Sequence, residues 1–116
     1  MFRLLVCGGR DVTDVDFVFR VLDRVRCKIN QPLLVIHGDA RGADRLAGQW
    51  ARHVGFHEVK VPALWDIHDK CAGPIRNHAM LWLEPNGAVA FPGGSGTADM
   101  VAKCRAARIP VFLPRP

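Results

Sequence analysis

The stretch LLVIHGDARGADRLAGQWARHV, residues 33–54, contains the pattern that decides the fold class. Its apolar run over 33–36 predicts a strand over 33–38 that is buried on both faces and ends in a glycine turn. Apolar residues then recur at helical spacing from Ala43 to Val54, and Gly55 fits the C-terminal cap of that helix. A buried strand, a glycine turn and an amphipathic helix make one unit of a parallel α/β sheet.

The same unit recurs along the chain. Strands are predicted over 3–9, 33–38, 56–61, 88–91 and 110–113. Helices are predicted after a capping box formed by Thr13 and Asp16, and over 43–54, 74–83 and 96–108. Residues 62–73 are predicted to form a long loop, and loops of this length are often functional. We therefore predict one α/β domain over residues 1–116, with a mostly parallel five-stranded sheet and helices on both faces.

Composition and charge restrict the function classes. Hydrophobic residues make up 49% of the 116 residues, which is typical of a soluble domain, and no apolar run approaches the ~20 residues of a membrane span. The first apolar run is too short for a secretory signal, so a cytoplasmic location is expected. The four cysteines contain no C-x-x-C pair, and neither a metal site nor a cofactor is expected. A net charge of +5 favours anionic partners.

Three glycine-containing loops follow predicted strands: CGGRD (7–11), HGDARGAD (37–44) and FPGGSGT (91–97). Right-handed crossovers place such loops at one edge of a parallel sheet, where ligands bind in this class of fold. Glycine lets the backbone approach a ligand closely, and a helix N-terminus offers unpaired N–H groups to a phosphate. The candidate ligand-binding residues of these loops are Gly8, Gly9, Arg10, His37, Gly38, Arg41, Gly42, Asp44, Pro92, Gly93, Gly94, Ser95, Gly96 and Thr97. None of the loops is a Walker loop or a dinucleotide fingerprint.

Four further residues are candidates because of their chemistry. Arg76 and Asn77, in the first turn of the helix predicted over 74–83, could pair with a phosphate and contact a base edge or a ribose hydroxyl. Trp65 in the long loop could stack on a base or fill the core. Asp99, in the first turn of the helix predicted over 96–108, either contacts a ligand or complements the helix dipole.

The segments GGRD, HGDARGAD, AGPIRN and FPGGSGTADM resemble the YspA-like branch of the SLOG superfamily over essentially the whole chain. This resemblance implies a Rossmann-like fold and a nucleotide or nucleotide-derived ligand. The superfamily includes the Lonely Guy phosphoribohydrolases, which share the motif P-G-G-x-G-T-x-x-E and an arginine in R-K-x-x-M. The arginine is present here as Arg76, but Met100 stands where the motif has its glutamate.

The missing glutamate bears on catalysis. Cleavage of an N-glycosidic bond develops positive charge on the sugar, which a nearby carboxylate stabilises. Methionine cannot do this, and Asp99 is the nearest substitute, so Arg76 and Asp99 are the catalytic candidates if the chain is an enzyme. We favour a sensor or sequestering module that binds its ligand intact, with phosphoribohydrolase activity as the alternative.

The resemblance also assigns roles within a nucleotide site. Gly93, Gly94, Gly96 and Thr97 would hold the phosphate and Arg41 and Arg76 would neutralise it, while Asp44 and Asp99 would take ribose hydroxyls and His37, Asn77 and Trp65 would border the base. A third function, single-stranded DNA binding as in DprA, needs aromatic stacking platforms. The chain has no tyrosine, so nucleic acid is not the expected partner. Trp82 makes a homodimer through the helix predicted over 74–83 a candidate assembly.

Overall fold

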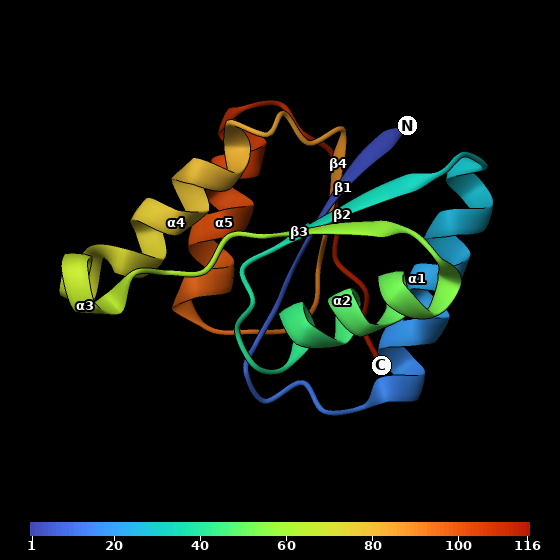
Figure 1. Cartoon of the computed structure of the whole chain (residues 1–116), viewed down its shortest axis with the longest axis horizontal. Helices are drawn as coiled ribbons and strands as arrows, with labels where there is room; N and C mark the ends of the chain where they lie inside the picture. Colours follow the sequence, from blue (N-terminus) through green and yellow to red (C-terminus); the bar gives the residue numbers. More distant parts are fainter.

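The computed structural model describes all residues, 1–116, and contains a five-stranded sheet in the order β3-β2-β1-β4-β5 (Figure 1). The strands are β1 (Phe2–Cys7), β2 (Leu33–His37), β3 (His57–Lys60), β4 (Gly87–Ala90) and β5 (Val111–Phe112). The helices are α1 (Val15–Ile29), α2 (Ala43–Val54), α3 (Trp65–His68), α4 (Ala72–Leu81) and α5 (Ser95–Ala106), with a 3₁₀ turn η1 (Asp69–Cys71) before α4. Every strand pair is parallel, so the predicted fold class is confirmed.

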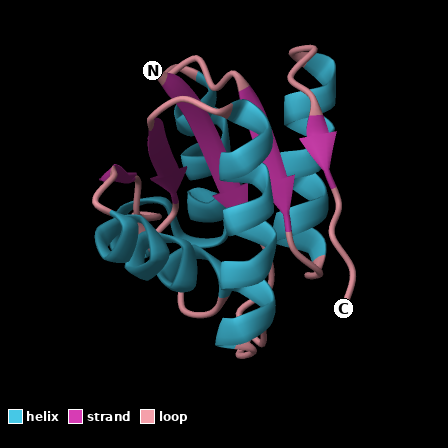
Figure 2. Cartoon of the chain, turned by 90° about the vertical axis from the view of Figure 1, so that its right-hand side faces the viewer, coloured by secondary structure: helices cyan, strands magenta, loops and turns pink.

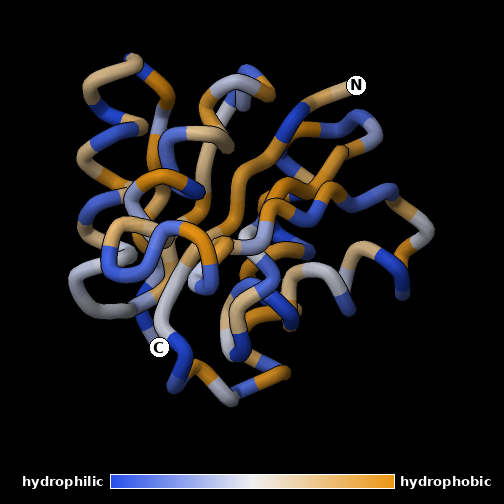
Figure 3. Tube along the Cα trace, turned by 60° about the vertical axis from the view of Figure 1, so that its left-hand side comes forward, coloured by the Kyte–Doolittle hydropathy of each residue, from blue (hydrophilic) through white to orange (hydrophobic).

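Helices cover both faces of the sheet, with α1 and α2 on one face and α4 and α5 on the other (Figures 1 and 2). Alternate residues of β1 supply the two cores, because successive side chains of a strand point to opposite faces. Val6 packs among the buried residues under α1 and α2, whereas Leu5 packs under α4 and α5. The strands accordingly form the hydrophobic centre of the molecule (Figure 3). No helix has both the length and the hydrophobicity to cross a bilayer.

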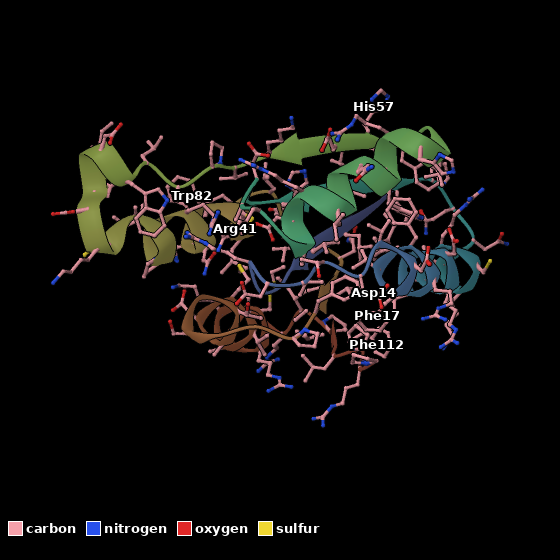
Figure 4. The ribbon with its side chains drawn as sticks, turned by 90° about the horizontal axis from the view of Figure 1, so that it is seen from below. Asp14, Phe17, Arg41, His57, Trp82 and Phe112 are labelled. Atoms are coloured by element: carbon pink, nitrogen blue, oxygen red, sulfur yellow. The ribbon has the colours of Figure 1, made fainter.

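The start of α1 differs from the prediction. Asp14, not Thr13, is the N-cap, and its carboxylate accepts a hydrogen bond from the Phe17 amide at 3.0 Å (Figure 4). Asp14 lies three residues before Phe17 and supplies the acceptor directly, so the Thr13–Asp16 capping box is wrong. The predicted end of α2 is confirmed, because Gly55 adopts a φ of 86° and its amide donates to the last turn.

The predicted long loop contains helical structure. Residues 65–71 form α3 and η1, and α4 begins at Ala72 rather than at Pro74. Proline is tolerated in the first turn of a helix, because the amide that it lacks would have no partner there. Arg76 and Asn77 therefore lie in the second turn of α4 and not in the first.

Candidate functional site

A cavity of about 560 Å³ opens at the carboxyl edge of the sheet, between the loops that follow β1 and β4 and the segment from α3 to α4. Figure 4 labels Arg41, which lies in the loop after β2 at this edge. Most of the predicted site residues lie on its wall: Gly8, Gly9, Arg10, Asp44, Trp65, Arg76, Asn77, Gly94, Ser95, Gly96, Thr97 and Asp99. The remaining predicted residues, which are His37, Gly38, Arg41, Gly42, Pro92 and Gly93, do not line this cavity.

The N-terminus of α5 presents unpaired amides to the cavity. Gly94 is the N-cap and supplies no side-chain cap, and the first amide of the helix that is bonded belongs to Ala98, which donates to the Gly94 carbonyl at 3.0 Å. The amides of Ser95, Gly96 and Thr97 have no acceptor within the chain. Free amides at a helix N-terminus attract anions, because they carry partial positive charge and lack a partner.

The packing of the protein does not require glycine at positions 94 and 96. A Cβ atom at either position would meet no atom within 4 Å, and neither residue has a positive φ. Side chains at these two positions would extend into open space beside the cavity rather than into the protein. Their absence keeps the α5 amides accessible to a ligand.

The other glycines of the three loops serve packing between the loops. The Gly9 amide donates to the Pro92 carbonyl at 2.9 Å, and the Gly9 carbonyl accepts from the Ala43 amide at 3.2 Å. A Cβ at Gly93 would collide with Thr97 and the Gly9 amide, and one at Gly42 would collide with the Gly9 carbonyl. The ligand contacts of Gly42, Pro92 and Gly93 stay predictions: these residues lie outside the main cavity, and the N-terminus of α2 is occupied by the chain itself.

Arg76 is held over the cavity by two of its nitrogens. Its Nη1 donates to the Gly38 carbonyl at 2.8 Å, and its Nε donates to Asn77 Oδ1 at 2.9 Å. Gly38 makes room for this arrangement, since a side chain there would overlap the Arg76 guanidinium. Nη2 has no partner in the chain and is available to an anion.

Asn77 joins α4 to α5. It is only 3% exposed, and its Nδ2 donates to the Gly96 carbonyl at 3.1 Å and to Asp99 Oδ2 at 3.0 Å. Its oxygen accepts from Arg76 Nε, so Asn77 holds Arg76 and the N-terminus of α5 in place, and its contact with a base stays a prediction.

Asp99 keeps one carboxylate oxygen free. Its Oδ2 also accepts from Lys103 Nζ at 2.6 Å, whereas Oδ1 has no partner. Burial by itself would raise the pKa of Asp99, but the hydrogen bonds from Lys103 and Asn77 outweigh it and hold the pKa below the usual value. The carboxylate is therefore ionised at neutral pH on the cavity wall.

Asp44 shapes the loop that follows β2. It is 6% exposed, and its Oδ2 accepts from the amides of Gly38 at 3.1 Å and Ala40 at 3.3 Å. Burial raises its pKa, against the opposing effects of the Ala40 amide and the Arg76 charge. Both bonds are accepted by Oδ2 of the carboxylate that the resemblance assigns to a ribose hydroxyl. Burial likewise raises the pKa of the Cys7 thiol to about 12, so this cavity residue is not a nucleophile.

His37 and Arg41 are two of the six predicted residues that lie outside the main cavity. His37 is 1% exposed, its Nε2 is 2.6 Å from Glu58 Oε2, and its Nδ1 accepts from the Asp39 amide at 3.0 Å, so both ring nitrogens have partners within the chain. Arg41 is exposed and lies 3.9 Å from Asp11. Met100, at the position of the Lonely Guy glutamate, is buried in the core under α4 and α5 and cannot face a ligand.

The structure also adds residues that the sequence did not indicate. The cavity wall includes Cys7, Ala40, Lys70, Gly73, Pro74 and Met80. One feature of the sequence could have indicated Lys70 as a site residue: it is the only lysine or arginine of the segment 62–73. Across the mouth of the cavity the Arg10 guanidinium lies 5.7 Å from the ring of Trp65, a cation–π contact between two wall residues.

The contact between His37 on β2 and Glu58 on β3 predicts that the free energy of unfolding falls in acid. Burial by itself would raise the pKa of Glu58, but the hydrogen bonds from His37 and Arg52 outweigh it and hold the pKa below its usual 4.5. The unfolded chain therefore protonates first, and stability that is present above pH 4.5 is lost as the pH falls through the folded-state pKa. Urea unfolding is expected to show this loss in the wild type and a flatter decline in Glu58→Gln. Parallel declines would contradict the assignment.

A comparison with protein families identifies the family of this chain. Residues 2–68 match the model of the family described as YspA, cpYpsA-related SLOG. The chain belongs to this SLOG family. Gene 61 protein of Mycobacterium phage D29 is 36% identical over 121 residues, which cover 97% of this chain and 95% of that protein. The predicted membership is confirmed.

Solved structures show the same SLOG fold at low sequence identity. The structural-genomics protein TM1055 superposes with a TM-score of 0.73 at 21% identity, covering 96% of this chain and 72% of that one. DNA processing protein A (DprA) from Streptococcus pneumoniae superposes with a TM-score of 0.79 at 17% identity over 100% of this chain. The chain spans about half of DprA, 51% of its length.

Proposed function

We propose that this SLOG protein binds a nucleotide, or a small molecule derived from one, with a phosphate group at the N-terminus of α5. The observation that carries the proposal is the pair of open glycines, Gly94 and Gly96, beside three amides that have no acceptor. A phosphate accepts several such hydrogen bonds at once and complements the helix dipole. The module then acts as a sensor or sequesters the ligand without cleaving it.

The rest of the cavity wall suits the other parts of a nucleotide. Trp65 is 48% exposed and offers a ring face to a base, and Asp99 Oδ1 offers an acceptor to a ribose hydroxyl. Arg10, Lys70 and Arg76 supply positive charge. The volume of about 560 Å³ falls within the range of small-molecule sites, roughly 300–1,000 Å³.

A ligand screen tests the proposal. Nucleoside 5′-monophosphates are expected to raise the melting temperature, with about 2.7 kcal/mol of stabilisation at a concentration 100 times the Kd. The matching nucleosides should give much smaller shifts, because they lack the phosphate. Equal shifts from nucleoside and nucleotide would contradict the proposed phosphate site. A short single-stranded oligonucleotide that binds tightly at high salt would instead favour a DprA-like role.

A second candidate function, phosphoribohydrolase activity, is favoured by one observation. Asp99 is ionised, lines the cavity and has a free oxygen, as a carboxylate that stabilises developing charge on a ribose must. Chromatography of each nucleotide after incubation separates the two functions. Intact nucleotide supports binding alone, whereas free base that disappears in Asp99→Asn supports the hydrolase.

The homodimer stays a prediction, and α4 is the candidate surface. Ile75 in α4 and Trp82, the C-cap of this helix, are seven residues apart and so lie on one side of it, and they are 44% and 77% exposed. Burial of such side chains is the main source of association energy. Light scattering is expected to report a dimer for the wild type and a monomer for Trp82→Glu. A wild-type monomer at high concentration would exclude this assembly.

A further inference from the structure

A second cavity, of about 460 Å³, adjoins the first and shares four residues with it: Arg10, Ala40, Trp65 and Arg76. Arg41 and Arg45 line only this second cavity, whereas the residues of the α5 N-terminus line only the first. The two cavities therefore form one surface that has the helix N-terminus at one end and arginines at the other.

The second cavity is strongly basic. Four arginines line it, at positions 10, 41, 45 and 76, and Asp39 is its only acidic residue. Arg45 Nε donates to the Asp39 carbonyl at 3.2 Å and lies 3.6 Å from the Asp39 carboxylate. Among the other three guanidinium groups only that of Arg41 has an ion-pair partner, the Asp11 carboxylate at 3.9 Å.

The remaining arginines have weak or neutral partners. Arg41 lies 3.9 Å from an Asp11 side chain that is fully exposed, and such a pair contributes little in water. Arg10 contacts the Trp65 ring, and Arg76 donates to backbone and amide oxygens and has the buried Asp44 carboxyl nearby. Guanidinium groups that share a cavity repel one another, so a bound anion would relieve this repulsion and gain charge-assisted hydrogen bonds.

We propose that this cavity binds a second phosphate group of the ligand, and that the ligand is a nucleotide with two phosphates at separate positions. The inference rests on the proposed function, since it assigns the first phosphate to the α5 N-terminus. The shared wall formed by Arg10, Trp65 and Arg76 then lies against the nucleoside between the two phosphates. Arg41 and Arg45 determine specificity for the second phosphate.

Calorimetric titration of matched nucleotides tests this inference. The probes are the 5′-monophosphates and the 3′,5′-bisphosphates of adenosine, guanosine, cytidine and uridine. For the preferred base, the bisphosphate is expected to bind at least about tenfold more tightly than the monophosphate, which corresponds to about 1.4 kcal/mol. The double variant R41A/R45A should lose this preference and keep the monophosphate affinity.

Three controls make the outcome decisive. Arg105→Ala removes one positive charge from the last turn of α5, away from both cavities, and should keep the preference. Arg41→Ala alone removes a residue that makes no hydrogen bond within the chain, so it tests the same cavity without loss of a structural contact. The melting temperature of each unliganded variant verifies its fold.

The failures are distinguishable. If monophosphates bind and bisphosphates bind no more tightly, the second phosphate site is overturned and the proposed function stands. The same conclusion follows if R41A/R45A keeps the preference. If neither class binds the wild type, the proposed function itself fails, and the inference falls with it.

Discussion

Gly94→Asp is expected to abolish the binding of nucleoside 5′-monophosphates without unfolding the protein. The new carboxylate would lie at the N-terminus of α5, where the unpaired amides are assigned to the phosphate, and the two negative charges would repel. The fold should persist, because no atom lies within 4 Å of a Cβ at this position and φ is −96°. Because Gly94 has ψ −144°, outside the usual N-cap conformation, aspartate should gain little as a cap, and the melting temperature should stay close to that of the wild type.

Two controls accompany this variant. Gly94→Ala adds a Cβ without charge and should weaken binding much less. Gln31→Asp adds the same charge at an exposed position before β2, at the opposite edge of the sheet, and should leave affinity unchanged. Calorimetric titration measures all three. An affinity for Gly94→Asp within a factor of about two of the wild type would exclude the α5 N-terminus as the phosphate site.

Gly42→Ala is expected to destabilise the fold by about 3 kcal/mol. Gly42 has φ 87° and ψ −131°, a conformation that costs other residues of order 1–3 kcal/mol. The added Cβ would also collide with the carbonyl oxygens of Gly9 and Arg10, which are backbone atoms that cannot rotate away. Urea unfolding should therefore give a much lower midpoint with an unchanged slope.

Gly96→Ala is the matched control for Gly42→Ala. Gly96 is the second residue of α5 and has open space where a Cβ would lie, so alanine should stabilise the helix by roughly 0.5–1 kcal/mol. The pair thus separates a glycine needed for folding from one that folding does not need. Equal losses of stability in the two variants would contradict the division of the loop glycines into packing and cavity residues.

The fold was predictable from the sequence because its signals are local. The apolar run 33–36 and the helical spacing over 43–54 correspond to β2 and α2, and Gly55 ends α2 as expected. Errors occurred where short-range hydrogen bonds compete. Asp14 rather than Thr13 caps α1, and residues 65–71 form helical turns in a segment without apolar periodicity.

The site was predictable in outline, since parallel topology brings the loops after β1, β2 and β4 to one edge. The roles of single residues were not predictable, because they depend on contacts between distant segments. The sequence assigns His37 to the ligand, but its partner Glu58 lies 21 residues away on β3. Gly42 and Gly94 look alike in the sequence, and only the packing of one loop on another distinguishes them.

The amide resonances of the α5 N-terminus test the central claim most directly. In a ¹⁵N–¹H correlation spectrum, titration with inorganic phosphate and then with the preferred nucleoside 5′-monophosphate should shift the amides of Ser95, Gly96 and Thr97 most. These amides have no acceptor in the chain, so a bound phosphate changes their hydrogen bonding more than that of any paired amide. Saturable binding that leaves these three resonances in place would contradict the assignment of the phosphate to this helix.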